Sequence, residues 1–417
     1  MKKKSIWLIS AFAVILAVVG GIYIYIDSTV KKYDNAFYPN VKIEGIDLTS
    51  QTKEQALKTL GSVTDKYDQI SVTVKVGDKS YKKQLKEIGV QYDLDQQIND
   101  AFKYGKNDKL IEQYNLIKNK EGKEYTVDYA IDEAALQTWV ETIEKNIKTH
   151  PQNASIHITN GNATVTPDKK GTEIDQKQLQ QSLVEALNQH KKQDIEVTAV
   201  LKEVEAPITK KDLENVREKI GTFTTNYSAN DYNRNTNIKL ATKTIDSYLL
   251  MPGDSFSFND FVGDTTADKG YLGAGSYLNG EVVDSLGGGV CQVSTTLYNA
   301  IIKAGIIPDV RYNHSMTVGY VPIGQDAAIA YPYKDLKFTN PYNSPVYIEG
   351  SVSPTSVTFT LYSTADSKPA NVSYQLASSI VSQSAGGTQS VTYLETIKDG
   401  AVSDRKQLSK DTYRAKK

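Results

Sequence analysis

The sequence predicts an α+β protein in which an N-terminal transmembrane helix precedes several small mixed domains. Three observations predict this. Residues 6–26 contain no charged side chain, and a run of this length is enough to span a bilayer. Alternating runs typical of strands are interspersed with helical periodicities along the rest of the chain. A short pattern at 89–93 returns at 171–175, and each copy precedes a helical segment, which indicates two related α+β modules.

The N-terminal segment, residues 1–27, is predicted to be a signal anchor. Lysines at positions 2–4 precede the apolar run, and positively charged residues stay on the cytoplasmic side of a membrane. We therefore expect a single-pass membrane protein with its N-terminus in the cytoplasm and the bulk of the chain outside. The segment is longer than a signal-peptide core and lacks a clear Ala-x-Ala site. These features favour an uncleaved anchor, with a cleaved signal peptide as the alternative.

The two related modules are predicted at 38–122 and 123–206. In the first, an alternating run at 70–76 indicates a strand. In the second, an amphipathic helix is expected at 132–147, and the Asn-Gly pair at 160–161 indicates the turn of a β-hairpin. The lysines of both modules are expected to form a solvated face, although a contact with an anionic wall polymer is an alternative.

A third domain is predicted at 210–363, after a linker that contains Pro207, and a small β-rich module is predicted at 372–417. The sequence patterns of the third domain predict helices at 211–218 and 231–250, a helix that begins at the cysteine, and strands at 223–227, 255–260, 309–320, 335–339, 345–351 and 357–363.

Charge balance and cysteine content limit the classes of function. The 48 basic and 49 acidic residues give a net charge of −1, so no nucleic-acid partner is expected. The spacings of common metal sites are absent and the four histidines are scattered, so no metal or other cofactor is expected. The single cysteine cannot form a disulfide within the chain. A free thiol is a liability in an oxidising compartment, so its presence in an exported protein favours a functional role.

That cysteine, Cys291, follows three glycines at 287–289 and begins a helical pattern that ends at Gly305. Unpaired N–H groups and the helix dipole stabilise a thiolate at a helix N-terminus, so we predict a lowered pKa and a nucleophilic role for Cys291. Backbone N–H groups of the glycine loop are expected to form an oxyanion hole. The candidate substrate-binding residues are Gly288, Gly289, Gln292 and Ser294. The alternative is a buried cysteine that packs as a small hydrophobic residue.

His314 is the candidate general base. If 309–320 is a regular strand, His314 lies on its apolar face, which is expected to pack under the helix that begins at Cys291. The imidazole can then take the thiol proton. Asp326 is the candidate acceptor that orients the imidazole. The alternative acceptors are Asp335 and Asn340, and the alternative for the imidazole is a core histidine bonded to backbone.

Five stretches of the third domain carry a resemblance to a known family. They are Met-Pro-Gly-Asp-Ser-Phe-Ser-Phe-Asn at 251–259, Gly-Gly-Gly-Val-Cys-Gln-Val-Ser-Thr-Thr-Leu-Tyr-Asn-Ala at 287–300, Asn-His at 313–314, Gly-Gln-Asp-Ala at 324–327 and Asp-Leu-Lys-Phe-Thr-Asn at 335–340. Together they resemble the VanW family, which is named from vancomycin-resistance clusters. The two upstream repeats resemble the peptidoglycan-binding module that precedes VanW and L,D-transpeptidase domains.

The resemblance implies a Gram-positive cell-envelope protein that acts on peptidoglycan stem peptides at the cell wall. Some VanW-domain proteins are reported as L,D-transpeptidases that use the motif cysteine, which is Cys291 in this chain. The resemblance thus implies a cysteine acyl-transferase that forms 3–3 crosslinks through a thioester. The better-known L,D-transpeptidase domain has a Ser-His-Gly-Cys motif, whereas here the cysteine precedes His314, so shared chemistry requires a different arrangement of parts. The alternatives are a non-catalytic peptidoglycan-binding protein and a cysteine peptidase or amidase.

Overall fold

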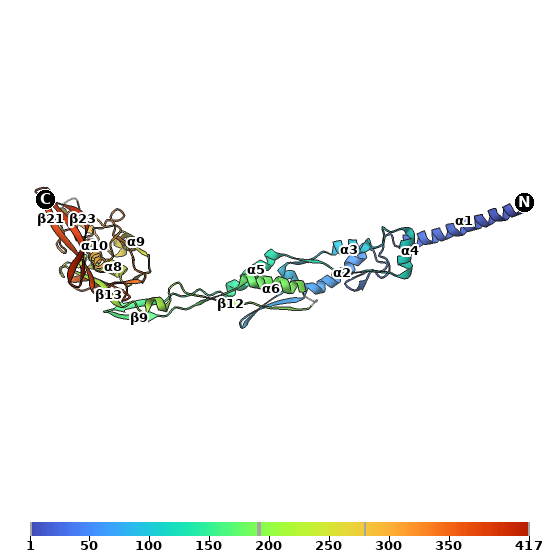
Figure 1. Cartoon of the computed structure of the whole chain (residues 1–417), viewed down its shortest axis with the longest axis horizontal. Coiled ribbons are helices and arrows are strands. Elements are labelled where there is room, and N and C mark those ends of the chain that lie inside the picture. Colours follow the sequence, from blue (N-terminus) through green and yellow to red (C-terminus); the bar gives the residue numbers. More distant parts are fainter. Residues whose placement is uncertain (1, 190–192, 279–280, 416–417) are drawn as a thin grey trace. The chain divides into compact units, whose positions relative to one another are not determined.

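The computed structural model describes residues 2–189, 193–278 and 281–415. It confirms the α+β class, because helices and several small sheets alternate along the chain (Figure 1). The helices predicted at 132–147 and at Cys291 are both present.

The chain divides into two compact units. Unit 1 comprises 1–150 and 171–204, and unit 2 comprises 151–170 and 205–417. Residues 151–170 contain the β-hairpin that was predicted within the second module. In the structure this hairpin folds with unit 2. The boundaries of the five predicted domains remain predictions.

Helix α1 is the helix predicted as the anchor, and it spans Lys2–Lys31. Among the described residues it is the one helix long and apolar enough to cross a membrane, over Trp7–Lys31, and its most apolar window of 18 residues has no buried residue. Length and composition thus make α1 a candidate signal anchor.

Unit 1 contains two hydrophobic cores, one around Leu60 and one around Trp139. Its other described helices are α2 (Lys53–Asp68), α3 (Leu94–Phe102), α4 (Leu110–Asn119), α5 (Glu133–Ile147) and α6 (Gln176–Gln189), with a 3-10 turn η1 (Leu85–Ile88). Its described strands are β1 (Lys42–Ile43), β2 (Ile46–Asp47), β3 (Ser71–Val76), β4 (Lys79–Gln84), β5 (Val90–Tyr92), β6 (Glu124–Tyr125), β7 (Tyr129–Ile131), β10 (Gly171–Ile174), β11 (Ile195–Thr198) and β12 (Leu201–Val204). These strands form the small sheets β2-β1-β6, β11-β3-β4, β5-β7 and β10-β12.

Both copies of the repeated pattern have the same local structure, a short strand followed by an aspartate that caps a helix. The Asp93 carboxylate accepts a hydrogen bond from the Gln96 N–H at 3.0 Å before α3. The Asp175 carboxylate accepts one from the Gln178 N–H at 3.1 Å before α6. Such side chains satisfy N–H groups that have no partner within the helix, so the aspartate fixes where each helix begins.

Unit 2 is built around a four-stranded antiparallel sheet of order β13-β20-β19-β14. Its described helices are α7 (Lys210–Leu213), α8 (Tyr232–Ile245), α9 (Phe258–Val262) and α10 (Val290–Lys303), with a 3-10 turn η2 (Ala267–Lys269). Its described strands are β8 (Ser155–Thr159), β9 (Asn162–Thr166), β13 (Glu218–Asn226), β14 (Tyr248–Leu250), β15 (Ser255–Ser257), β16 (Gly273–Leu278), β17 (Glu281–Leu286), β18 (Lys337–Thr339), β19 (Val346–Val352), β20 (Ser356–Ser363), β21 (Val372–Ser384), β22 (Gly387–Lys398) and β23 (Ala401–Arg414).

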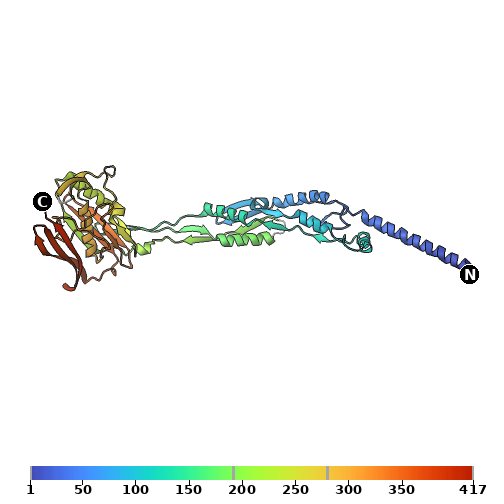
Figure 2. The same cartoon turned by 90° about the horizontal axis from the view of Figure 1, so that it is seen from above.

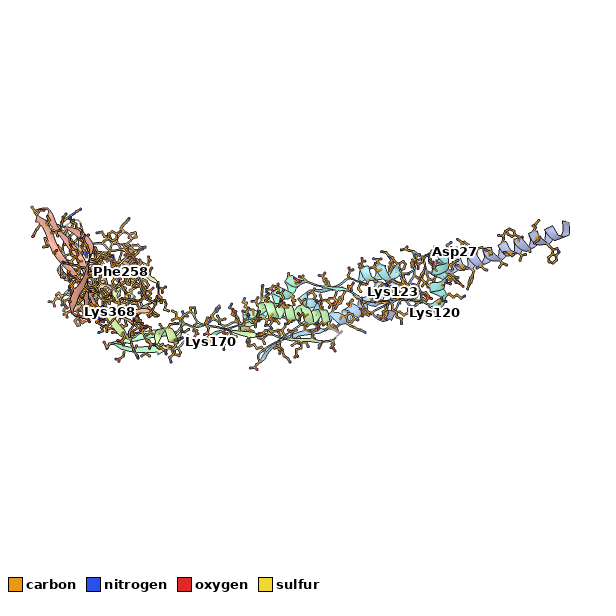
Figure 3. The ribbon with its side chains drawn as sticks, viewed as in Figure 1. Asp27, Lys120, Lys123, Lys170, Phe258 and Lys368 are labelled. Atoms are coloured by element: carbon orange, nitrogen blue, oxygen red, sulfur yellow. The ribbon has the colours of Figure 1, made fainter. Side chains whose placement is uncertain are left out.

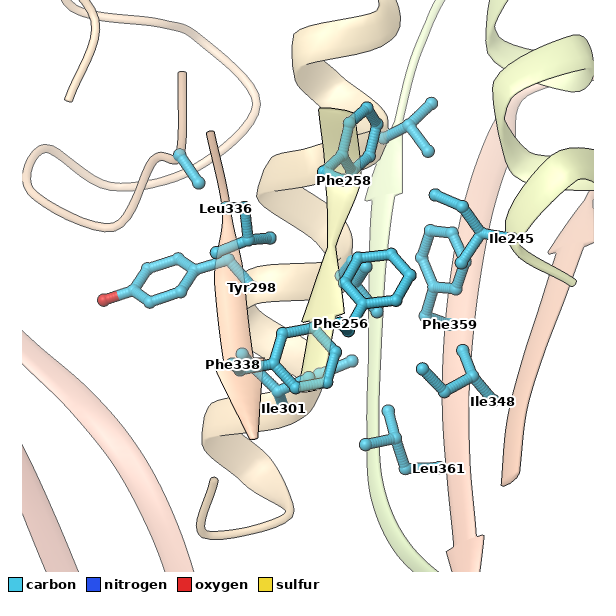
Figure 4. Packing of buried hydrophobic residues seen from close by; sticks show 14 of the residues in the cluster. Ile245, Phe256, Phe258, Tyr298, Ile301, Leu336, Phe338, Ile348, Phe359 and Leu361 are labelled. Carbon is cyan, nitrogen blue, oxygen red and sulfur yellow. The ribbon is translucent and has the colours of Figure 1, made fainter. Parts of the chain in front are cut away.

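The core of unit 2 lies between α10 and this sheet. Phe256 stacks on Phe338 with ring centroids 4.9 Å apart, in the same cluster as Ile301 of α10 (Figure 4). Phe258 is fully buried among the side chains of this unit (Figure 3). Helix α10 approaches β13 closely because β13 carries Gly221, where an added Cβ would lie 2.5 Å from the Ala300 carbonyl oxygen. This close packing fixes the helix that begins at the cysteine.

The last three strands form one antiparallel sheet, β21-β22-β23, drawn in red in Figure 2. A separate β-rich module was predicted at 372–417. In the structure this sheet folds with unit 2, since Leu394 of β22 belongs to the core cluster that contains α10. Its last strand reaches the candidate active site, as described below.

Four predicted elements differ from the structure. The helix predicted at 211–218 ends at Leu213, and Glu218 already begins β13. The strand predicted at 255–260 ends at Ser257, and α9 begins at Phe258.

The strand predicted at 309–320 is wrong, because this stretch is irregular and only Val310 makes an isolated bridge, to Lys337. The helix predicted at 231–250 ends at Ile245, because Ser247 has a φ of 66° and β14 then begins. Backbone in this left-handed region cannot continue an α-helix.

Candidate active site

Cys291 is the second residue of α10, so its position at a helix N-terminus is confirmed. Gly289 caps the helix with a φ of 107°, a conformation that favours glycine. The side chain of Cys291 is partly exposed, and its thiol donates a hydrogen bond to the Ile329 carbonyl at 3.4 Å. The sulfur therefore lies at the start of a buried helix and remains accessible from a cavity.

The structure brings His314 and Asp326 together. The Asp326 carboxylate accepts a hydrogen bond from His314 Nδ1 at 2.5 Å and another from the His314 backbone N–H at 2.7 Å. Both side chains are buried, with 7% of His314 and 1% of Asp326 exposed. These two bonds fix the orientation of the imidazole ring and place a proton on Nδ1. Nε2 is therefore the nitrogen that can take the proton of the Cys291 thiol.

His314 and Cys291 line the same cavity, and the imidazole interacts with the thiol there. Burial alone would raise the pKa of the Cys291 thiol, but the interaction with His314 and its positive charge outweigh burial and lower it. Burial disfavours the charged imidazole, yet the hydrogen bond to Asp326 and the interaction with Cys291 raise the pKa of His314 to about 9. Both pKa shifts act in the same direction, since each favours a thiolate beside an imidazolium.

Asp326 is held in turn by residues that the sequence analysis did not identify. Arg311 donates to its carboxylate at 3.1 Å and to its backbone carbonyl at 2.6 Å, and the Tyr413 hydroxyl of β23 donates to the carboxylate at 2.5 Å. Arg311 also donates to both carboxylate oxygens of Asp411, another residue of β23, at 2.7 and 2.8 Å. Burial raises the pKa of Asp326, but the bond to His314 and the nearby positive charges lower it to about 2. Asp326 is therefore ionised at neutral pH.

Asp335 and Asn340, the alternative acceptors for the His314 ring, form their hydrogen bonds with other residues. The Asp335 carboxylate accepts from the Ser257 hydroxyl at 2.6 Å and the Asn259 N–H at 2.9 Å. The Asn340 amide donates to three backbone carbonyls, one of them that of Leu250 at 3.1 Å. Among the three candidates, the structure places Asp326 against His314.

A cavity of about 260 Å³ opens beside the sulfur. Of the predicted residues, Gly289, Cys291, Gln292 and His314 line it. Tyr320 also lines it, and burial raises the pKa of this phenol, so its hydroxyl stays protonated.

Gly288 and Ser294 lie outside that lining. Gly288 is buried against Ala274, where an added Cβ would lie 2.3 Å from the carbonyl oxygen. Ser294 is fully buried and donates to the Ala327 carbonyl at 2.7 Å, next to Asp326. Their assignment to substrate binding remains a prediction, and their contacts point to a role in holding the cavity wall.

Two backbone N–H groups are suited to donate hydrogen bonds to an oxyanion. Within the described ranges, the N–H groups of Gly289 and Cys291 have no hydrogen-bond acceptor. The N–H of Gln292 instead donates to the Gly289 carbonyl at 2.9 Å, and that of Gly288 donates to the Ser285 carbonyl at 3.3 Å. Both residues line the cavity beside the sulfur, where free N–H donors can stabilise a tetrahedral oxyanion in acyl transfer.

No group of three or more histidine, cysteine, aspartate or glutamate side chains arranged for metal binding occurs in the described part of the chain.

Comparison with known proteins gives two family matches. Residues 233–362 match the model described as VanW like protein, and residues 81–196 match the model described as putative peptidoglycan binding domain. The first match includes Cys291, His314 and Asp326, and it ends before β21.

Two curated proteins are similar to part of the chain. Uncharacterized protein YoaR of Bacillus subtilis (strain 168) is 40% identical over 146 residues, which are 35% of this chain and 48% of that protein. Vancomycin B-type resistance protein VanW of Enterococcus faecalis (strain ATCC 700802 / V583) is 32% identical over 109 residues, 25% of this chain and 40% of that protein. The chain thus covers less than half of either relative. No solved structure matches it significantly.

Proposed function

We propose that the chain, which matches the VanW like protein model at 233–362 and the putative peptidoglycan binding domain model at 81–196, is a cysteine acyl-transferase of peptidoglycan stem peptides. In this proposal it acts like an L,D-transpeptidase and forms 3–3 crosslinks through a thioester on Cys291. The observation that carries the proposal is that Cys291 and His314 line one cavity while Asp326 binds the far side of the imidazole. A nucleophile, a base and a group that orients the base are the parts that such acyl transfer needs.

In the first step the Cys291 thiolate attacks the carbonyl carbon that precedes the terminal D-Ala of a donor stem, while the imidazolium of His314 holds a proton on Nε2. The carbonyl oxygen becomes negative and accepts hydrogen bonds from the N–H groups of Gly289 and Cys291. The carbon–nitrogen bond to D-Ala then breaks, and the leaving amine takes the proton from His314. A thioester remains on the sulfur.

In the second step the side-chain amine of another stem attacks the thioester carbonyl. It gives a proton to His314 Nε2, the carbon–sulfur bond breaks, and Cys291 leaves as a thiolate. The product is an amide crosslink, and the thiolate–imidazolium pair is restored. With water in place of the amine the same steps give a carboxypeptidase.

We further propose that α1 anchors the chain, with the N-terminus in the cytoplasm and both units at the cell wall. The lysines at positions 2–4 support this orientation, and the peptidoglycan-binding match supports the location. In this arrangement the modules at 38–122 and 123–206 bind peptidoglycan, and the domain at 210–363 carries the reaction with the support of 372–417.

Product analysis with the full-length chain in detergent micelles tests the function. Disaccharide-tetrapeptides are incubated with the wild type and with the Cys291→Ala and His314→Gln variants, and the products are separated and weighed by mass spectrometry. We expect D-Ala release and 3–3 dimers with the wild type and at least a hundredfold less with either variant. His157→Gln, which alters a histidine of β8 outside the cavity, is the matched control and is expected to retain activity.

Three results would overturn this function. Equal product from the wild type and Cys291→Ala excludes the cysteine mechanism. Binding of stem peptides without turnover indicates a non-catalytic peptidoglycan-binding protein. Cleaved monomers without any dimer, at any concentration of amine acceptor, indicate a peptidase or amidase.

A further inference from the structure

The cavity beside Cys291 contains two positively charged side chains and no acidic one. Arg234 and Lys334 both line it, whereas Asp326 lies behind His314 and is matched by Arg311. Asp284, which stands opposite Gly275 in the β16–β17 hairpin, is not among the lining residues. The thiolate–imidazolium pair adds no net charge, so the wall of the cavity carries an excess of positive charge.

Arg234 is held firmly at the helix N-terminus. Its guanidinium donates to Gln292 Oε1 at 2.8 Å, and the Gln292 amide donates to Thr225 Oγ1 at 2.9 Å and the Asn226 carbonyl at 3.0 Å. Its aliphatic part packs on Gly289, where an added Cβ would lie 2.9 Å from Arg234 Cγ. The contact with Gln292 uses one of the five guanidinium N–H donors. Arg234 forms no ion pair with any described residue, so further donors are available to a ligand.

Lys334 lies on the histidine side of the same cavity. Its ammonium group donates to the Asn313 carbonyl at 3.3 Å, and Asn313 directly precedes His314. The backbone of Lys334 pairs with Ala330 through two hydrogen bonds of 2.8 and 2.9 Å, which fixes the segment that carries it. No carboxylate within the described ranges neutralises Lys334. Both cations therefore line the cavity that contains the nucleophile.

We propose that Arg234 and Lys334 form a subsite for the free carboxylate of the residue that leaves the donor peptide. Half-buried cations without counter-ions in a narrow cavity favour an anionic ligand, and a guanidinium matches the two oxygens of a carboxylate. The subsite restricts the donor to peptides that end one residue after the scissile bond. This inference rests on the proposed function, because it assumes that the reacting carbonyl lies at Cys291.

Binding to a variant that cannot react separates this inference from the proposed function. The probes are a D-Ala-terminated stem tetrapeptide and the same peptide with its C-terminal carboxylate converted to an amide. Isothermal titration of each probe into full-length Cys291→Ser is expected to show that the acid binds about 10- to 100-fold more tightly than the amide, as expected for loss of a charge-assisted contact. Adding Arg234→Gln or Lys334→Met should remove most of this preference, and Arg234→Lys should restore part of it.

Lys239→Met is the matched control, because Lys239 is an exposed lysine on the same helix as Arg234 and lies outside the cavity. Equal affinity for acid and amide, or no measurable binding of either, would overturn the subsite. Loss of affinity for both probes by the same factor in Arg234→Gln would also overturn it, since that result reports a general packing role. If the acid preference is present while the wild type shows no turnover, the subsite stands and the acyl-transferase function fails.

Discussion

Tyr413→Phe tests whether the last strand of the chain supports the candidate active site. The change removes a hydroxyl that donates to the Asp326 carboxylate at 2.5 Å and accepts from the Gly324 N–H at 3.0 Å. Tyr413 and Asp326 are each 1% exposed, so water cannot replace either bond. A hydrogen bond to a buried charge contributes about 1.5–3 kcal/mol, and leaving a buried N–H unsatisfied costs about 1–3 kcal/mol. We therefore expect the free energy of unfolding of unit 2 to fall by roughly 2–4 kcal/mol.

The effect on the site should be smaller than the effect on stability. Asp326 keeps three other donors, namely the His314 ring, the His314 N–H and Arg311. Its pKa should rise from about 2 but stay below neutrality. The rate at which iodoacetamide alkylates Cys291 at neutral pH should therefore fall by less than about tenfold, since one unit of pKa corresponds to about 1.4 kcal/mol.

Hydrogen exchange measured by mass spectrometry on peptides from α10 and β23 reports the unfolding free energy of unit 2 directly. Tyr393→Phe is the matched control, because Tyr393 lies on the adjacent strand β22 and its hydroxyl has no hydrogen-bond partner among the described residues. Unchanged exchange in Tyr413→Phe would refute the reasoning, and so would the same change in both variants.

Three further predictions concern the same site. In His314→Gln, the inflection in the pH dependence of Cys291 alkylation should move to a higher pH than in the wild type, because burial then raises the thiol pKa without an opposing imidazolium; an unmoved inflection contradicts the pair. The pKa of Asp326 in the folded state lies below its ordinary value. Its ionised carboxylate should therefore contribute roughly 2 kcal/mol to the free energy of unfolding above pH 4, and this contribution should be lost as the pH falls through about 2. Acid unfolding of Asp326→Asn should show no such loss. Gly221→Ala should destabilise unit 2 by about 1–3 kcal/mol by pushing α10 away from β13, which hydrogen exchange in α10 would detect, and an unchanged α10 would contradict the packing argument.

The helix that begins at Cys291 was predictable because its signals are local. Apolar residues repeat at helical spacing after a glycine loop, and Gly305 ends the pattern with a φ of 85°. The nearness of His314 to Cys291 was also predicted, but from a strand that does not exist. In the structure His314 is held in an irregular segment by Asp326, which binds both its ring and its backbone N–H.

The supports of the site could not be predicted in the same way. Tyr413 lies 87 residues after Asp326, and no periodicity links the two positions. Arg234 reaches Gln292 from a separate helix, 58 residues earlier in the chain. Such contacts depend on how α8, α10 and the β21–β23 sheet pack together, and a single sequence carries no direct signal for that packing.

The most direct test of the account is the intact mass of the full-length chain after brief incubation with a D-Ala-terminated tetrapeptide and no amine acceptor. We predict an adduct equal to the tetrapeptide minus D-Ala, located on Cys291, released by hydroxylamine and absent in Cys291→Ala. Turnover of the peptide without any such adduct, or the same adduct on another residue, would contradict the claim that this sulfur forms the thioester.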